Sequence, residues 1–162
     1  MLEQGLFPNL ITLQQVNYLV SRLREVEKLL YKPDQQWQEF LDEYLSAQEQ
    51  EELRGSWSKQ QVDLDNPISV DKALQSLLER LAKLTIIKVV VARELSQKMC
   101  KWLHRSLEDN LGTRLVIDKQ IDEDLVGGMV IEHEGKQWDY SLRKKLEEEG
   151  GEEIINKYLI SN

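Results

Sequence analysis

Thr85-Ile-Ile-Lys-Val-Val-Val-Ala92 is rich in β-branched side chains and almost continuously apolar. Such a stretch is typical of a central strand that is buried on both faces of a sheet. Up to Leu84 the apolar residues recur at helical spacing, so the hydrophobic period of the chain changes at Thr85. The segment therefore predicts a β-sheet in the second half of a chain whose first half is helical.

The residues after this strand predict a small α/β domain. Ser96 can cap a helix that Gly112 ends, because Ser is favoured at helix N-caps and Gly just beyond helix C-termini. The further elements that we expect are a strand at 114–118, a strand at 126–133, a hairpin at 133–138 and a last helix from Asp139 or Ser141. Helices and strands in this order form a mixed sheet with helices packed on it.

Two amphipathic helices, at 10–31 and 34–54, are predicted for the first part of the chain. Pro33 and Asp34 interrupt the helical pattern between them, with Asp34 as a candidate N-cap. A short connection between amphipathic helices favours an antiparallel hairpin.

The fold class that follows is α+β and mostly helical. We expect an N-terminal helical hairpin at 1–57, a polar linker at 58–67 that ends in a proline, and a C-terminal α/β domain at 68–162. That C-terminal domain would begin with a helix near Ser69 or Asp71, on which a wide apolar stripe indicates burial in a core or against a sheet.

The apolar stripes of the two N-terminal helices are candidates for binding a partner helix. Narrow stripes of this kind suit packing on one other helix, which can be each other or a helix of a partner. Both interpretations remain open for the candidate partner-binding residues Leu13, Val16, Leu23, Val26, Leu30, Trp37, Phe40 and Tyr44.

Composition excludes several classes of partner. The net charge is −8, from 29 acidic and 21 basic residues, which argues against a nucleic-acid surface built of clustered Lys and Arg. No window approaches the roughly 18 uninterrupted apolar residues of a membrane span, so we expect no direct membrane insertion. The N-terminus has no secretory pattern, and the single Cys100 fits a reducing compartment, which together indicate the cytoplasm.

A search for reactive groups finds no catalytic, cofactor-binding or metal-binding constellation. Cys100 and His104 share one helix face, but zinc would need two more ligands, so we expect Cys100 in the core and His104 at its rim. Gly127-Gly128 precedes a strand, whereas a phosphate loop would open a helix. Two glycines before a strand indicate a bulge or a close approach by a neighbouring segment. We therefore expect no cofactor and no enzyme.

Residues 84–149 resemble the C-terminal domain of the ATP synthase delta subunit family, whose mitochondrial relative confers oligomycin sensitivity. The resemblance rests on Ile121-Asp-x-x-Leu-Val-Gly-Gly-Met-Val-Ile131 followed by Asp139-x-Ser-Leu-Arg-x-x-Leu146. Its structural motif comprises Gly127, Gly128, Asp139, Ser141, Arg143 and Leu146. Asp139 and Ser141 can both cap the helix that follows, which makes these residues architectural.

The resemblance implies a non-catalytic peripheral-stalk, or stator, subunit of a rotary proton- or ion-translocating ATP synthase. It implies two partners, the b-type stalk subunit and the N-terminal region of the alpha subunit, and a cytoplasmic position peripheral to the membrane. Two alternatives remain: an E-type stalk subunit of a vacuolar or archaeal ATPase, and an unrelated regulatory protein-binding module.

Overall fold

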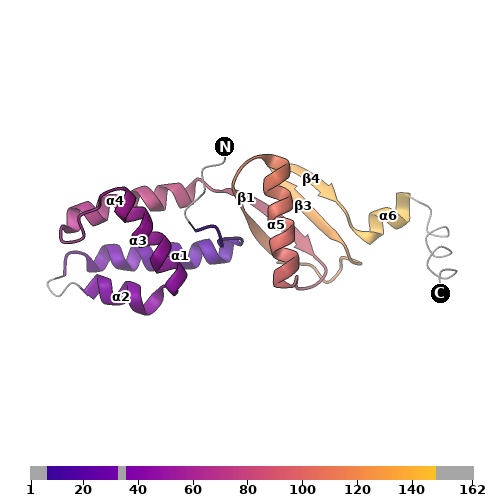
Figure 1. The fold of residues 1–162 in the computed structure, drawn as a ribbon. Helices are drawn as coiled ribbons and strands as arrows, with labels where there is room; N and C mark the ends of the chain where they lie inside the picture. Colours follow the sequence, from indigo (N-terminus) through magenta and orange to yellow (C-terminus); the bar gives the residue numbers. More distant parts are fainter. Residues whose placement is uncertain (1–6, 33–35, 149–162) are drawn as a thin grey trace.

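The structure, a computed structural model, describes residues 7–32 and 36–148. These residues form a helical half followed by a four-stranded sheet with one long helix packed on it, and the two halves lie end to end (Figure 1). The α+β fold class predicted from the sequence is confirmed, with helices leading and a mixed sheet following. The predicted N-cap Asp34 and the last part of the predicted C-terminal domain, 149–162, lie outside the described residues.

Four helices build the helical half: α1 (Leu13–Leu29), α2 (Gln36–Tyr44), α3 (Ala47–Lys59) and α4 (Pro67–Ala82). Helix α1 begins at a capping box. The Thr12 hydroxyl accepts a hydrogen bond from the Gln15 backbone N–H, and the Gln15 side-chain oxygen accepts one from the Thr12 backbone N–H. Its fully buried Leu19, Leu23 and Val26 form the centre of the core of this half.

The second predicted helix, at 34–54, is wrong in one respect, because the structure divides this region into α2 and α3. Ser46 has an extended backbone and caps α3, accepting from the Glu49 N–H while the Glu49 carboxylate accepts from the Ser46 N–H at 2.8 Å. A capping box competes with helix continuation, since it satisfies the amide groups that a new helix start leaves free. The Ser-x-x-Glu spacing at 46–49 was the signal that could have shown the break.

Helix α4 packs inside the helical half. Its buried Val70, Leu74 and Leu77 belong to the same apolar core as Leu19 and Leu23 of α1. Asn66 caps the helix and Pro67 occupies its first position, where a missing N–H costs nothing. The predicted boundaries of independent domains remain a prediction, but the core of the helical half includes this helix.

The sheet consists of β1 (Thr85–Val91), β2 (Leu115–Ile121), β3 (Met129–His133) and β4 (Lys136–Asp139) in the spatial order β2-β1-β3-β4. Strands β1 and β2 are parallel and are connected through α5 (Gln97–Leu111), whereas β3 pairs antiparallel with both β1 and β4. The short helix α6 (Leu142–Glu148) follows β4.

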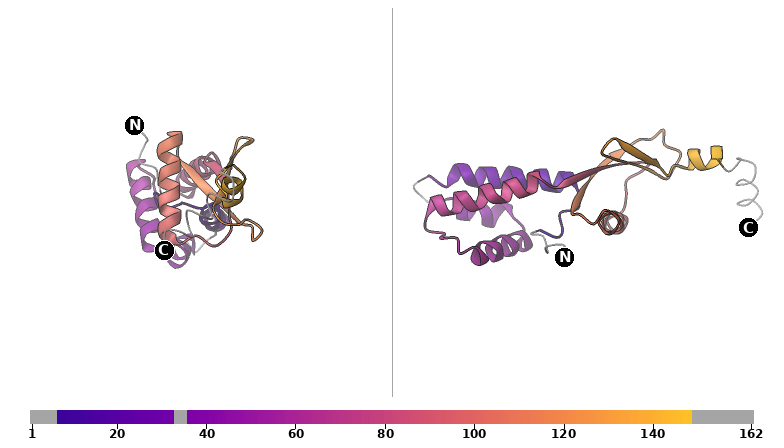
Figure 2. Two further views of the ribbon diagram at one scale, coloured as in Figure 1. Left: turned by 90° about the vertical axis from the view of Figure 1, so that its right-hand side faces the viewer. Right: turned by 90° about the horizontal axis from the view of Figure 1, so that it is seen from above.

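Strand β1 is central, as predicted, but it is buried on one face only. Ile87, Val89 and Val91 lie in the core beneath α5, whereas Ile86 on the opposite face is 50% exposed. The expectation of burial on both faces was wrong because no described helix packs on β1 at that opposite face, which we call the open face (Figure 2), although Val116 of the neighbouring β2 is buried there against the helical half. A mixed sheet with one helical layer leaves its second face to solvent.

The free edge of β2 joins the two halves. Ile11 and Thr12, which lead into α1, extend along this edge, with a parallel bridge from Thr12 to Ile117 and a 2.8 Å bond from the Ile117 N–H to the Ile11 carbonyl. Val116 of β2 points into the core of the helical half. The edge strand is thereby paired, and the angle between the halves is set by backbone hydrogen bonds.

Leu74→Ala tests whether α4 belongs to the helical core. We expect it to lower the free energy of unfolding by about 2–5 kcal/mol, because it removes a fully buried side chain. Ile68→Ala on the same helix removes a 57% exposed side chain and should change stability by less than about 0.5 kcal/mol. Urea unfolding measures both, and equal effects would contradict this placement of α4.

Candidate functional site

Gly127 and Gly128 lie directly against the segment that connects β4 to α6. A β-carbon on Gly128 would collide with the Tyr140 carbonyl oxygen and lie 2.9 Å from the Ser141 Cα, and one on Gly127 would lie 3.0 Å from Leu142 Cδ1. Both glycines have positive φ, +92° and +81°, a region that other residues rarely adopt. The close approach of a neighbouring segment predicted from the sequence is therefore what the structure contains.

Backbone hydrogen bonds close this contact on both sides. The Tyr140 N–H donates to the Met129 carbonyl at 2.8 Å, and the Leu142 N–H donates to the Gly127 carbonyl at 3.1 Å. The loop before β3 and the loop after β4 are therefore held as one unit. We call this unit, residues 127–129 with 139–142, the glycine clasp.

Asp139 and Ser141 fix the start of α6. Asp139 Oδ1 accepts from the Ser141 N–H at 2.8 Å, and Ser141 Oγ accepts from the Lys144 N–H at 3.3 Å. Hydrogen bonds from the Ser141 side chain and then its backbone lower the pKa of Asp139. Ser141 is buried, so its hydroxyl lies inside the clasp. Among the other motif residues, Leu146 is half-buried and Arg143 is exposed.

The open face of the sheet is polar and predominantly acidic. Lys88 and Glu132 form an ion pair of 3.0 Å across β1 and β3, with Val90 and Val130 in the next row. A shallow hollow of about 440 Å³ lies over these strands and reaches Asp139 and Arg143 of the motif. Its remaining charged residues are Asp122 and Asp124.

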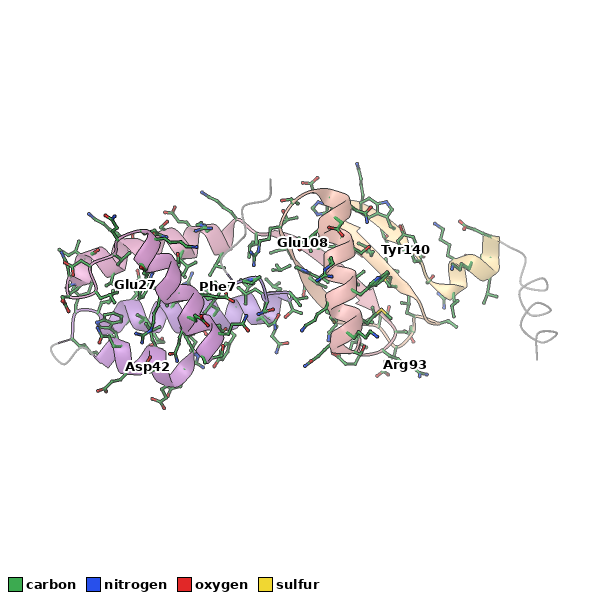
Figure 3. The ribbon with its side chains drawn as sticks, viewed as in Figure 1. Phe7, Glu27, Asp42, Arg93, Glu108 and Tyr140 are labelled. Atoms are coloured by element: carbon green, nitrogen blue, oxygen red, sulfur yellow. The ribbon has the colours of Figure 1, made fainter. Side chains whose placement is uncertain are left out.

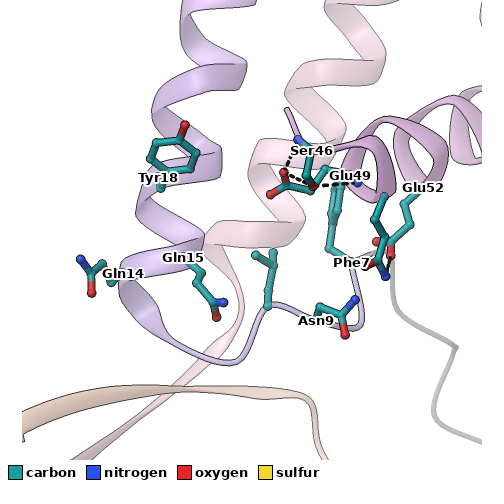
Figure 4. A pocket seen from close by; sticks show the side chains of 10 residues that line it. Phe7, Asn9, Gln14, Gln15, Tyr18, Ser46, Glu49 and Glu52 are labelled. Carbon is teal, nitrogen blue, oxygen red and sulfur yellow. Dashed lines mark hydrogen bonds between the residues drawn. The ribbon is translucent and has the colours of Figure 1, made fainter. Parts of the chain in front are cut away.

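A groove lies on the helical half between the start of α1 and the start of α3 (Figure 4). It has a volume of about 440 Å³ and is lined mainly by Phe7, Leu10, Gln14, Gln15, Tyr18, Ser46, Gln48, Glu49 and Glu52. Phe7 and Leu10 lie at the floor of the groove and are themselves almost fully buried, and polar side chains surround them. An apolar groove with a polar margin suits an amphipathic helix.

Beside the groove, Arg22 of α1 is stacked between two tyrosines. Its guanidinium carbon lies 4.9 Å from the ring centroids of both Tyr18 and Tyr44, and Phe40 stacks on Tyr44 at 4.3 Å. Nε of Arg22 is buried without a hydrogen-bond partner among the described residues. The arrangement holds a positive charge in a fixed place beside exposed aromatic rings.

Most of the candidate partner-binding residues lie inside the helical half. Val16, Leu23, Val26, Leu30 and Trp37 are buried in its core, whereas Leu13 and Phe40 are half-buried against it. Tyr44, at 37% exposed, is the most accessible of them. Their packing favours the interpretation in which the helices pack on one another within the chain. The groove residues of α1 and α3, which no spacing pattern singled out, offer the more accessible surface.

The groups with reactive side chains have structural partners. His104 is buried, and its Nε2 donates to the Leu115 carbonyl of β2 at 2.9 Å, while Nδ1 lies 3.5 Å from Glu108. The prediction that Cys100 lies in the core and His104 at its rim is wrong, because Cys100 is only half-buried, whereas the bond to Leu115 holds His104 against β2. Within residues 7–32 and 36–148, no group of three or more His, Cys, Asp or Glu side chains could hold a metal ion. No helix in the same ranges is long and apolar enough to span a membrane.

Comparison with known proteins identifies relatives of the second half of the chain. The model of the family described as ATP synthase delta (OSCP) subunit matches residues 68–149, which is half of the chain. An ATP synthase subunit delta of Rhodospirillum centenum is 36% identical over 77 residues, and one of Rickettsia africae is 29% identical over 79 residues. These matches cover 48% and 49% of this chain, and 41% and 43% of the relatives, so the chain spans less than half of their length.

A solved structure also matches about half of the chain. A chain in the cryoEM structure of the Polytomella F-ATP synthase is 32% identical, and the match covers 49% of this chain and 100% of that chain, with a TM-score of 0.38. The glycine clasp lies wholly within the segment that the family model matches.

Gly128→Ala should destabilise the chain more than Gly135→Ala. Both positions have positive φ, but a β-carbon at Gly135 meets open space, whereas one at Gly128 meets the backbone of Tyr140 and Ser141. We expect Gly128→Ala to cost about 1–3 kcal/mol beyond the cost at Gly135, the usual range for overpacking. Urea unfolding measures both variants, and equal costs would show that φ alone requires the glycine.

Asp139→Asn tests the charge at the start of α6. Because the pKa of Asp139 is lowered in the folded chain, its carboxylate stabilises the fold above the unfolded pKa of about 3.9, and this contribution disappears as pH falls through the folded pKa. The wild type should therefore be more stable than the variant near pH 7, and the difference should vanish once the pH is below the lowered pKa of Asp139. Asp65→Asn, on the loop before α4, is the control and should show a smaller difference at pH 7.

Proposed function

Because the chain belongs to the ATP synthase delta (OSCP) subunit family, we propose that it is a non-catalytic peripheral-stalk subunit of a rotary ATP synthase. It would act as a stator that links the catalytic head to the stalk while protons or other ions drive rotation. The observation that carries the proposal is the glycine clasp, because the two halves of the family motif, 121–131 and 139–146, meet there in space. The motif is therefore an architectural unit, as a structural subunit requires.

A stator subunit must transmit torque between two partners without bending, and the joint at β2 suits that requirement. Backbone bonds from Ile11 and Thr12 to β2, together with Val116 in the helical core, connect the two halves of the chain. Arg114 adds a bond from its guanidinium to the Phe7 carbonyl. Paired edges and shared cores resist relative motion better than a flexible linker.

We propose that the helical half binds the N-terminal region of the alpha subunit through the groove between α1 and α3. An amphipathic helix could place its apolar side over Phe7 and Leu10 and a carboxylate beside Arg22. The sheet half would then bind the b-type stalk subunit. In this arrangement the chain lies at the cytoplasmic side, peripheral to the membrane, and is held there by the complex.

The alternatives from the sequence are less well supported. An E-type stalk subunit or an unrelated regulatory module does not account for the match of the delta family model over residues 68–149. Both halves of the motif fall inside that match and contact each other, which a coincidental likeness would not predict.

Binding to both partners tests the proposal. The purified chain should bind the alpha-containing catalytic head and the b-type subunit of the same organism, and omitting it from a reconstituted synthase should abolish ATP-driven ion pumping while ATP hydrolysis by the head continues. Absence of binding to alpha and b alike would overturn the proposal.

Tyr18→Ala tests the alpha-binding groove. Tyr18 lines the groove and stacks on Arg22, with 47% of its side chain exposed, so its removal should weaken binding to the head by about 10-fold or more, as for a hot-spot aromatic. Binding to b should be unchanged. Tyr31→Ala removes a more exposed aromatic side chain (63%) just beyond the other end of α1; it is the control and should leave both affinities unchanged.

A further inference from the structure

Phe7 has a backbone conformation that its side chain disfavours. Its φ is +59°, in the left-handed region that bulky residues rarely adopt. Pro8 follows it, and a residue before proline ordinarily has an extended backbone. Strained residues of this kind persist only where surrounding contacts hold them, and they cluster at functional sites. The contacts that hold Phe7 therefore indicate what its strain serves.

Two contacts within the helical half hold Phe7. Its ring is 2% exposed and belongs to the core of that half. Its carbonyl oxygen accepts a hydrogen bond from the Leu10 N–H at 3.1 Å, which closes the turn at 7–10. Together with Leu10, the ring forms the floor of the groove between α1 and α3 (Figure 4). The conformation of Phe7 therefore sets the shape of that floor.

A third contact comes from the sheet half. Arg114, which directly precedes β2, donates from its guanidinium to the same Phe7 carbonyl. A carbonyl oxygen has two lone pairs, so it can accept from both Leu10 and Arg114. Phe7 lies at the end of the helical half that faces the sheet, so this bond crosses the joint between the halves (Figure 3). The groove floor is thus held by a residue of the other half.

Acidic side chains from two further helices act on the Arg114 guanidinium. Burial lowers the pKa of Arg114, and the negative charges of Glu108 on α5 and Glu52 on α3 oppose that shift. Arginine keeps its charge in proteins, and a half-buried charge requires partners of this kind. Glu52 also lines the groove, beside Phe7 (Figure 4). Arg114 therefore interacts with the margin of the groove, with its floor and with the helix on the sheet.

We propose that Arg114 is a positioning residue for the groove: from the sheet half it holds Phe7 in the left-handed conformation, and so it keeps the groove floor formed for a partner helix. The inference rests on the proposed function only for the identity of that helix. Because Arg114 moves with β2, a change at the joint between the halves changes the groove floor as well.

Fluorine NMR tests the positioning in the full-length chain without a partner. The chain contains two phenylalanines, so labelling with para-fluorophenylalanine gives two resonances, and Phe40 on α2 serves as the internal reference. Arg114→Met keeps an apolar stem but no donor, and it should move the Phe7 resonance toward that of a solvent-exposed ring while the Phe40 resonance stays in place. Arg114→Lys keeps the charge but not the fork of donors, and it should move the Phe7 resonance less.

Arg93→Met is the matched control for these spectra. It removes an exposed arginine of the same half, at the opposite end of α5 from Glu108, and it should move neither resonance (Figure 3). Collapse of both resonances would mark Arg114→Met as unfolded, and Arg114→Lys would then decide. A Phe7 resonance that stays in place in the folded Arg114 variants would contradict the positioning role.

A double-mutant cycle on binding to the alpha-containing head tests what the positioning is for. Arg114→Met should weaken binding roughly 2- to 30-fold, the range for residues that act without contacting the ligand. In a chain that already carries Phe7→Ala, Arg114→Met should cost no further affinity, because Arg114 acts through Phe7. Losses that simply multiply would show that Arg114 acts by another route, and the inference would fail.

The two experiments separate this inference from the proposed function. If the wild type does not bind the head, the alpha-binding proposal fails, and the fluorine spectra still decide whether Arg114 positions Phe7. If the head binds but the Phe7 resonance does not respond to Arg114, only the positioning role is overturned.

Discussion

The two halves of this chain are joined by the free edge of β2, and the rest of the structure depends on that joint. A parallel strand at the edge of a sheet exposes unpaired amide groups, which must find partners or remain open to association. Here Ile11 and Thr12 supply those partners, and Val116 on the same strand enters the core of the helical half. This backbone contact therefore pairs the outer edge of β2, orients α1 and connects the helical half to the sheet.

At the other end of the sheet, the glycine clasp serves a similar purpose. The loop before β3 and the loop after β4 approach so closely that no β-carbon fits at Gly128, and two backbone bonds hold them together. Asp139 and Ser141 then fix the first turn of α6. For a protein that we propose to carry load between two partners, rigidity at both ends of the sheet matters more than a reactive site.

The two faces of the sheet differ in charge and in the kind of surface they offer. The open face carries a cross-strand ion pair and several carboxylates, as a solvated sheet face does. The opposite face carries α5, whose exposed side chains include Lys98, Lys101, Trp102 and Asp109.

The sequence alone determined the order of elements, the central position of β1, the caps at Ser96 and Gly112, and the family motif, because each depends on local spacing or on a residue with a distinct backbone preference. It did not show whether an apolar stripe packs within the chain or on a partner. The helical spacing around Val16 or Trp37 is the same in both cases. The break at Ser46 was visible only as a short capping pattern, which long-range packing had to confirm. Tertiary structure decided that α4 joins the helical core, that β1 is covered on one side, and that the Gly127-Gly128 and Asp139-x-Ser141 segments meet, because these outcomes depend on contacts between residues far apart in the chain.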